Sequence, residues 1–190
     1  MLALVCLAAA ACGSDGRPGR AEAATRVDSI APRDVELARF RAGLVEPTGL
    51  TGGAASRDAL VRRFMAALEQ RDSATLHSLL MTQAEFAYLY YPTNPEARPP
   101  YDLAPGLMWF LLEGRSRRGL VNALEDRGGV ALHYEGYSCT NRSQQGDNTV
   151  WSGCTVRRRQ AAGDTMVELL FGPIIERGGR FKFISYANKL

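Results

Sequence analysis

The stretch His133–Arg158, which reads HYEGYSCTNRSQQGDNTVWSGCTVRR, decides the fold of this 190-residue chain. Its two cysteines, Cys139 and Cys154, lie at equal distances from the dipeptide Gly146-Asp147. A dipeptide of this kind between two strand-like runs is typical of a two-residue β-hairpin turn. One antiparallel register therefore explains both the turn and a disulfide bond between Cys139 and Cys154.

The same register brings several polar side chains together on one face of the hairpin. It places Tyr137 beside Val156 and Glu135 beside Arg158. Because side chains alternate between the two faces of a strand, His133 and Glu135 lie on the same face as Tyr137. A histidine beside a carboxylate can act as an acid/base pair, since the carboxylate orients the imidazole and raises its basicity.

This face of the hairpin has two interpretations. If it lines an interior space, His133 and Glu135 are candidate catalytic residues. Tyr137 and Arg158 are then candidate ligand-binding residues. If the face is exposed to solvent, Glu135 and Arg158 form only a cross-strand salt pair, worth under about 1 kcal/mol.

The segments that flank the hairpin predict helices before it and strands after it. Ser56 is a suitable N-cap, and the next helix starts after Asp72 or Ser73. The run Thr82–Glu85 has the pattern of a capping box. Pro92 is expected to stop the helix that begins there. The expected helices cover residues 32–40, 57–68, 73–80, 83–91 and 106–126, the last with Gly114 and Gly119 as points of a break, and the expected further strands cover 165–176 and 180–187.

Helices followed by antiparallel strands predict an α+β fold, with N-terminal helices packed on one face of a curved, four-stranded antiparallel meander. The order of elements over residues 57–190 resembles the cone-like fold of the nuclear transport factor 2-like superfamily. That superfamily includes ketosteroid isomerases and SnoaL-like polyketide cyclases. The resemblance implies a space between helices and sheet, and it carries over no catalytic residue because it rests on element order and length.

Aromatic residues gather around the proline-rich stretch 92–105. They can line the mouth of a site for an apolar or sugar-like ligand, since a ring offers a large contact area and a polar tip. Tyr88, Tyr91 and Trp109 are the candidate ligand-binding residues of this group. The alternative is that most of these rings anchor the third and fourth helices in the core.

Composition argues against several functional classes. The net charge is +3, and acidic residues alternate with basic ones along most of the chain, so no nucleic-acid partner is expected. The chain has two histidines and no CxxC or HxxxH spacing, and therefore no metal site is expected. A glycine-rich phosphate loop and a G-x-S-x-G motif are also missing, and no cofactor is expected.

The first residues predict where the protein is located. Met1–Ala11 is uncharged and apolar, ends in small residues and is followed by Cys12. Because about 20 apolar residues are needed to cross a bilayer, this stretch is typical of a secretory signal. It resembles the signal of bacterial lipoproteins, which implies that Cys12 becomes the lipidated first residue of the mature protein. The alternative is an ordinary secretory signal in which Cys12 is incidental.

The expected organisation has three parts: a signal peptide at 1–11, a lipidated cysteine and flexible tether at 12–55 with a short helix, and a single α+β domain at 56–190. An exported location agrees with a disulfide between Cys139 and Cys154. We expect a lipid-anchored protein of the cell envelope that faces the periplasm or the exterior. Its partners would be the membrane, through the lipid, and an apolar small molecule or an envelope protein.

The expected function is therefore binding without catalysis, because the chain shows no converging set of catalytic groups. The alternative is a small enzyme of the isomerase, dehydratase or cyclase type that uses His133 and Glu135 inside the cone. A third interpretation is a structural domain docked to another envelope complex.

Overall fold

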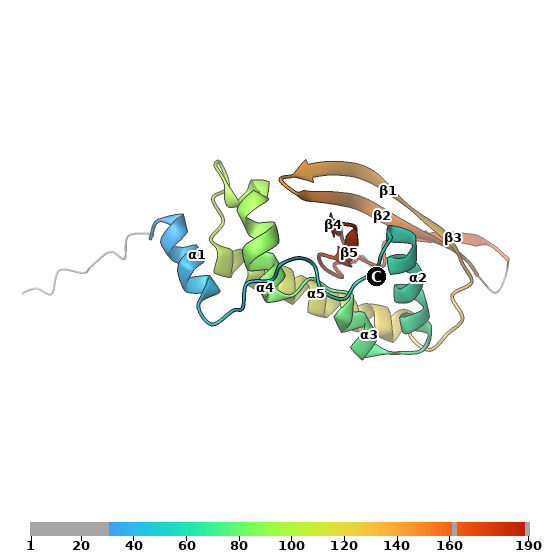
Figure 1. Ribbon diagram of the computed structural model, residues 1–190. Helices are drawn as coiled ribbons and strands as arrows, with labels where there is room; N and C mark the ends of the chain where they lie inside the picture. Colours follow the sequence, from blue (N-terminus) through green and yellow to red (C-terminus); the bar gives the residue numbers. More distant parts are fainter. Residues whose placement is uncertain (1–30, 161–162, 189–190) are drawn as a thin grey trace, which may run out of the picture. The chain divides into compact units, whose positions relative to one another are not determined.

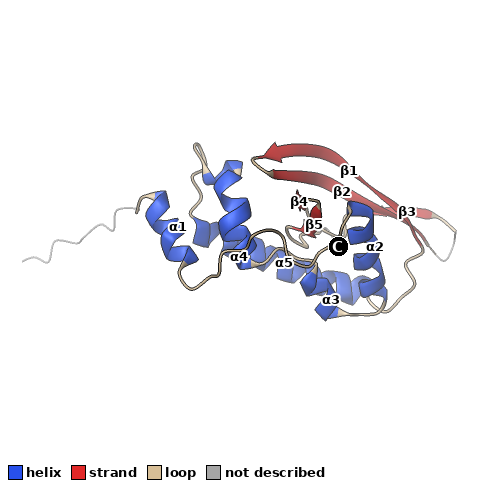
Figure 2. Ribbon diagram, viewed as in Figure 1, coloured by secondary structure: helices blue, strands red, loops and turns tan. Residues whose placement is uncertain are grey.

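The structure is a computed structural model that describes residues 31–160 and 163–188. These residues belong to one compact unit, Ala31–Leu190, in which helices come first and antiparallel strands follow (Figures 1 and 2). The predicted α+β class is confirmed. The predicted signal peptide at 1–11 and the predicted lipidation site Cys12 lie outside the described residues.

The helices begin where the sequence predicts. The Ser56 hydroxyl accepts a hydrogen bond from the Ala59 N–H at 3.1 Å, and Asp72 caps the next helix in the same way. Thr82 and Glu85 form the predicted capping box. The helices are α1 (Arg33–Arg41), α2 (Arg57–Glu69), α3 (Ser73–Ser78), α4 (Gln83–Glu85), a π-helical turn (Phe86–Tyr90), 3₁₀ turns (Tyr91–Thr93 and Pro95–Ala97) and α5 (Pro105–Arg127).

The predicted break in the last helix is wrong, because α5 runs without interruption from Pro105 to Arg127. A glycine inside a helix costs only about 1 kcal/mol relative to alanine, which tertiary contacts can offset. Gly119 has such a contact: a Cβ atom there would overlap the main-chain carbonyl of Tyr186. Gly119 therefore lets the C-terminal segment lie directly against the helix.

The sheet has five strands rather than the four predicted: β1 (Tyr134–Gln145), β2 (Asn148–Arg159), β3 (Thr165–Glu168), β4 (Ile174–Arg177) and β5 (Arg180–Phe183). Their order is β1-β2-β4-β5, and β3 also pairs with β2. The predicted strand 165–176 is interrupted at 169–173. Glu168 faces Val156 and Ile174 faces Trp151, so five residues of this segment lie opposite four residues of β2, and regular pairing is lost between them.

The last strand also ends earlier than predicted, at Phe183 instead of residue 187. Beyond it the chain turns towards α5, where the Tyr186 N–H donates to the Ser116 hydroxyl at 3.0 Å. Ile184 and Ser185 still form main-chain hydrogen bonds with Pro173 and Gly172, and contacts with α5 begin at Tyr186.

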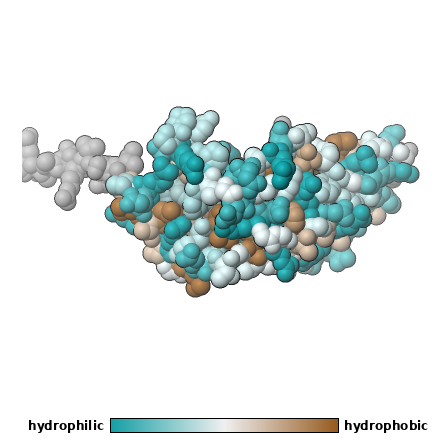
Figure 3. Space-filling view, turned by 45° about the horizontal axis from the view of Figure 1, so that its top comes forward, coloured by the Kyte–Doolittle hydropathy of each residue, from teal (hydrophilic) through white to brown (hydrophobic). Residues whose placement is uncertain are grey.

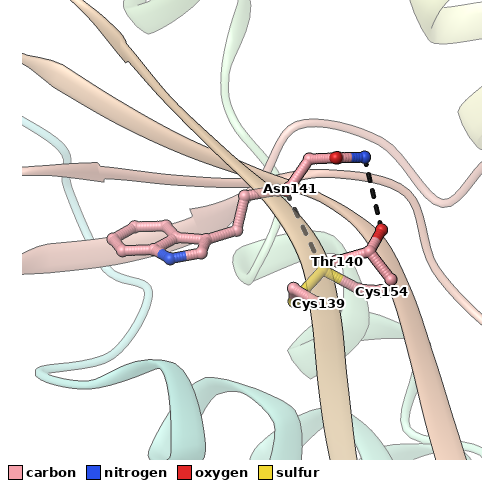
Figure 4. The surroundings of a disulfide bond; sticks show 5 residues. Cys139, Thr140, Asn141 and Cys154 are labelled. Atoms are coloured by element: carbon pink, nitrogen blue, oxygen red, sulfur yellow. Dashed lines mark hydrogen bonds between the residues drawn. A yellow bond between two sulfur atoms is a disulfide. The ribbon is translucent and has the colours of Figure 1, made fainter.

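The hairpin register is confirmed over most of its length: Cys139 faces Cys154, and Tyr137 faces Val156. The predicted pairing of Glu135 with Arg158 is wrong, because a bulge between Tyr134 and Gly136 places Tyr134 opposite Arg158. The Cys139–Cys154 disulfide is confirmed. Figure 4 shows it beside Asn141, whose side-chain amide donates to the Thr140 hydroxyl at 3.3 Å.

Removing this disulfide is expected to lower the free energy of unfolding by about 3 kcal/mol, because a crosslink across a loop of this length restricts the unfolded chain. The comparison is between the oxidised protein and the Cys139→Ala/Cys154→Ala variant in urea denaturation. An unchanged midpoint and slope would show that the crosslink does not contribute to stability.

The interior between α2 and the sheet is filled by aromatic side chains. The ring of Phe64 on α2 lies 5.3 Å from Phe171, 5.4 Å from Phe183 and 5.2 Å from Tyr186, measured between centroids. All four side chains are buried. This aromatic cluster occupies the space between α2 and the sheet.

A second core lies where the segment 86–93 packs between α5 and the end of the sheet. It includes Phe86, Met108, Ile175 and Ile184. Asn148, the first residue of β2, is buried and donates its side-chain amide to the Leu89 carbonyl at 2.7 Å. This bond fixes the tip of the hairpin to the helical segment.

A buried ion pair joins α4 to β5. The Lys182 ammonium lies 2.8 Å from the Glu85 carboxylate, and both side chains are at most 2% exposed. The main-chain N–H groups of Thr51 and Thr82 also donate to this carboxylate, at 2.6 and 2.7 Å. Burial raises the pKa of Glu85, but the hydrogen bonds from Lys182 and the two N–H groups outweigh it and lower the pKa overall.

Candidate functional site

The predicted catalytic residues His133 and Glu135 lie at the surface. His133 is exposed and the Glu135 side chain is 25% exposed, and both residues border an open hollow of about 450 Å³ that Arg159 also lines. Arg159 donates two hydrogen bonds to the Glu135 carboxylate, at 2.7 and 2.9 Å, and Arg157 lies 3.5 Å from it. The bulge turns Glu135 towards these two arginines. Catalysis by His133 and Glu135 stays a prediction.

Arg158 lies apart from that hollow and binds a different carboxylate. It donates to Glu168 on β3 at 2.6 and 3.0 Å, and Arg127 at the end of α5 lies 2.6 Å from the same group. Burial raises the pKa of Glu168, but the hydrogen bonds from Arg158 and Arg127 outweigh it and lower the pKa to about 2. This cluster joins the C-terminal end of α5 to the sheet.

The Glu168 carboxylate makes stability depend on pH. Since its pKa is lower in the folded state, its stabilising effect is complete above about pH 4.5 and is lost as the pH falls towards about 2. We expect Glu168→Gln to be less stable than wild type at pH 7, with the two melting temperatures converging near pH 2. Glu125→Gln, at an exposed position of α5, is the matched control. A constant difference between Glu168→Gln and wild type over this range would contradict the assignment.

Three of the predicted ligand-binding aromatic residues, Tyr88, Tyr91 and Tyr137, make contacts within the folded unit. Tyr91 is buried and donates its hydroxyl to the Leu103 carbonyl at 2.7 Å. The guanidinium of Arg41 lies 4.3 Å above the ring of half-buried Tyr88, which fixes α1 to the helical segment. Tyr137 is half-buried on β1, and this burial raises its pKa. The structure does not bring the three together, and their role in ligand binding stays a prediction.

Trp109, by contrast, borders a groove between α5 and the segment of α3 and α4. The groove has a volume of about 480 Å³. One side of the indole packs on the buried ring of Phe86, at 5.2 Å between centroids. Aliphatic side chains from both banks line the groove with Trp109: Leu80, Met81, Leu120, Val121 and Leu124.

Polar groups also line the groove. On one bank, the Nδ1 atom of His77 lies 3.3 Å from the Ser73 carbonyl. On the opposite bank, Glu113 and Arg117 form an ion pair of 2.9 Å. An apolar lining with a few polar groups is typical of a site that binds an apolar ligand.

Figure 3 shows one face of the molecule, on which hydrophobic surface occurs as separate patches among hydrophilic ones.

Among the residues that line this groove, sequence reasoning predicted a ligand-binding role for Trp109. The spacing of residues 109, 113, 116, 120 and 124 places them on one flank of a helix, a signal that is present in the sequence. The sequence does not reveal that the opposite bank comes from residues 73–83, because that depends on how the helices pack.

Two further findings apply to residues 31–160 and 163–188. In this part of the chain, no three histidine, cysteine, aspartate or glutamate side chains lie close enough to hold a metal ion. Its helices also include none that is both long and apolar enough to cross a bilayer.

No protein family model, curated protein or solved structure matches this chain.

Proposed function

We propose that this chain is a lipid-anchored protein of the cell envelope whose folded unit binds an apolar small molecule without catalysing a reaction. The observation that carries the proposal is the groove formed by Trp109 and its aliphatic neighbours beside α5. Its volume of about 480 Å³ lies in the range of small-molecule sites. An aromatic ring on an apolar floor favours a ligand with a hydrocarbon or ring system.

The packing of the interior supports binding over catalysis. Phe64, Phe171 and Phe183 fill the space beneath the sheet, so an enclosed reaction chamber has no support there. A site at the outer surface leaves an apolar ligand partly accessible to solvent, which suits capture and release. The polar groups on both banks of the groove would then orient the ligand.

The anchor part of the proposal rests on Met1–Ala11 and Cys12. The Cys139–Cys154 disulfide agrees with an exported protein that faces the periplasm or the exterior. Mass spectrometry of the N-terminal peptide from membranes tests it: we expect an acylated peptide that starts at Cys12. A soluble protein with an unmodified N-terminal peptide would contradict the anchor without affecting the groove.

For the fold we propose the cone-like arrangement of the nuclear transport factor 2-like superfamily, supported by the order of helices and strands. The aromatic cluster would then be a filled version of the cone interior. An experimental structure whose strands superpose poorly on members of that superfamily would contradict this part.

Binding is tested by titrating the protein with N-phenyl-1-naphthylamine, a neutral apolar probe that fluoresces when it leaves water. Val121→Trp places a large side chain in the groove and is expected to weaken binding at least about tenfold. Val167→Trp is the matched control, because Val167 is exposed on β3, away from the groove. Equal binding by both variants, or no binding by wild type, would contradict the proposal.

The enzyme alternative has one supporting observation, which is that His133 and Glu135 border the same hollow. It is the weaker proposal, since that hollow is open and Glu135 is already engaged by Arg159. Turnover of a polyketide or steroid-like substrate that is lost in both His133→Ala and Glu135→Gln would reverse this order.

A further inference from the structure

The outward side of α5 exposes large apolar side chains in its first two turns. Leu107 is 49% exposed, Phe110 69% and Leu111 38%. The residues lie three and four positions apart, so they form one continuous strip on the helix surface. We call Leu107, Phe110, Leu111, Arg115 and Arg118 the outer face of α5.

Positive charge follows the apolar strip along the same side of the helix. Arg115 and Arg118 are exposed one to two turns after Leu111, and neither takes part in an ion pair among the described residues. The neighbouring Arg117 is different, because Glu113 neutralises it at 2.9 Å. On the other flank, Glu96 and Arg115 border the same hollow. The outer face is therefore apolar at one end and positively charged at the other.

The folded unit begins close to this strip. α1, the first described helix, packs against α5, and a Cβ atom at Gly106 would lie 4.0 Å from the ring of Phe40 on α1. Arg33, at the start of α1, lies 3.2 Å from Asp102 in the loop before α5. The chain between Cys12 and Ala31 can reach at most about 65 Å when fully extended. An anchor at Cys12 would thus hold the unit near the membrane by the end that carries the apolar strip.

We infer that the outer face of α5 docks onto an anionic lipid surface. Phenylalanine and leucine enter the boundary between headgroups and acyl chains, while arginine binds lipid phosphates. Negative headgroups complement the exposed charges of Arg115 and Arg118, which a neutral lipid would not do. The inference rests on the proposed lipid anchor in one respect, which is that the anchor keeps the outer face of α5 near the membrane.

The test uses the full chain in a Cys6→Ser/Cys12→Ser background, with an environment-sensitive fluorophore on a single introduced cysteine. Gly114→Cys places the label in the middle of the outer face, where a side chain meets open space. Val167→Cys places it on β3 at a residue that is 62% exposed, and serves as the control. Vesicles of phosphatidylglycerol or phosphatidylcholine carry a spin-labelled lipid that quenches a fluorophore in contact with the membrane.

We expect the label at 114 to be quenched by phosphatidylglycerol vesicles and the label at 167 to stay unquenched. Arg115→Gln/Arg118→Gln should weaken this docking about 30-fold, because each arginine near an anionic surface contributes about fivefold. Arg157→Gln/Arg159→Gln removes two exposed charges from the hairpin and should leave docking within about twofold. Phe110→Ser should weaken docking about tenfold through lost apolar burial.

Equal quenching at both positions, or none at 114, would overturn the inference. A dimer that Phe110→Ser dissociates, with the label at 114 unquenched by lipid, would overturn it in favour of a second copy of the chain. Mass spectrometry of the Cys12 peptide tests the anchor by itself. Failure of docking and failure of the anchor are therefore distinguishable.

Discussion

Lys182→Met is expected to lower the free energy of unfolding by about 3–5 kcal/mol, which is the cost of removing one partner from a buried ion pair. The Glu85 carboxylate would stay buried and would lose the ammonium that lies 2.8 Å from it. Its remaining hydrogen bonds come from Thr51 and Thr82. They cannot supply the missing positive charge, so the pKa of Glu85 should rise in the variant.

Urea denaturation at pH 7 measures this effect, with Arg180→Met as the control. Arg180 begins the same strand but is exposed, so its replacement should change the free energy of unfolding by less than about 0.5 kcal/mol. The double variant Glu85→Gln/Lys182→Met should recover part of the loss, since it leaves no unpaired charge. Equal stabilities of Lys182→Met and Arg180→Met would contradict the role of the pair.

Gly119→Ala is the second change with a large expected effect, a loss of about 3 kcal/mol, which is the upper part of the range for overpacking. The added Cβ would overlap the main-chain carbonyl of Tyr186, and backbone cannot move aside as a flexible side chain can. The segment after β5 would have to leave α5. The hydrogen bond from the Tyr186 N–H to Ser116 would then be lost as well.

Gly114→Ala is the matched control on the same helix, because a Cβ at Gly114 meets nothing within 4 Å. Alanine should stabilise the helix there by about 0.5–1 kcal/mol. Thermal unfolding of both variants therefore gives shifts of opposite sign. A similar melting temperature for the two variants would contradict the close approach of the C-terminal segment to α5.

Local signals made much of the fold predictable from sequence. Ser56, Asp72 and Thr82 cap helices through residues three positions away, so their patterns are visible in short windows. The cysteines and the turn at Gly146-Asp147 constrain one another, which determined the register of the hairpin. Each of these features depends on sequence neighbours or on a single symmetric pairing.

Features that depend on distant packing were not predictable. The Glu85 side chain was assigned a local capping role, whereas its charged partner Lys182 lies far along the chain on β5. The interruption after β3 arises because residues 169–173 lie opposite only four residues of β2, which shifts the register by one. The bulge at Glu135 changed its partner from Arg158 to Arg159, which a regular register cannot foresee.

The candidate site shows the same difference between local signals and distant packing. Trp109 was identified because aromatic residues stand out in composition, but its aliphatic neighbours were not predicted to line a site. The groove exists because Leu80 and Met81 on one bank lie opposite Leu120 and Val121 on the other. Periodicity identifies the apolar flank of a helix, but it does not reveal whether another element covers that flank.

A titration of the ¹⁵N-labelled protein with N-phenyl-1-naphthylamine, followed by two-dimensional NMR, tests most directly whether the groove beside α5 binds apolar ligands. We expect shift changes at residues 73–83 and 109–124, with the indole N–H of Trp109 among the largest. Changes centred on His133 and Glu135, or no changes at saturating probe, would contradict the proposed binding site.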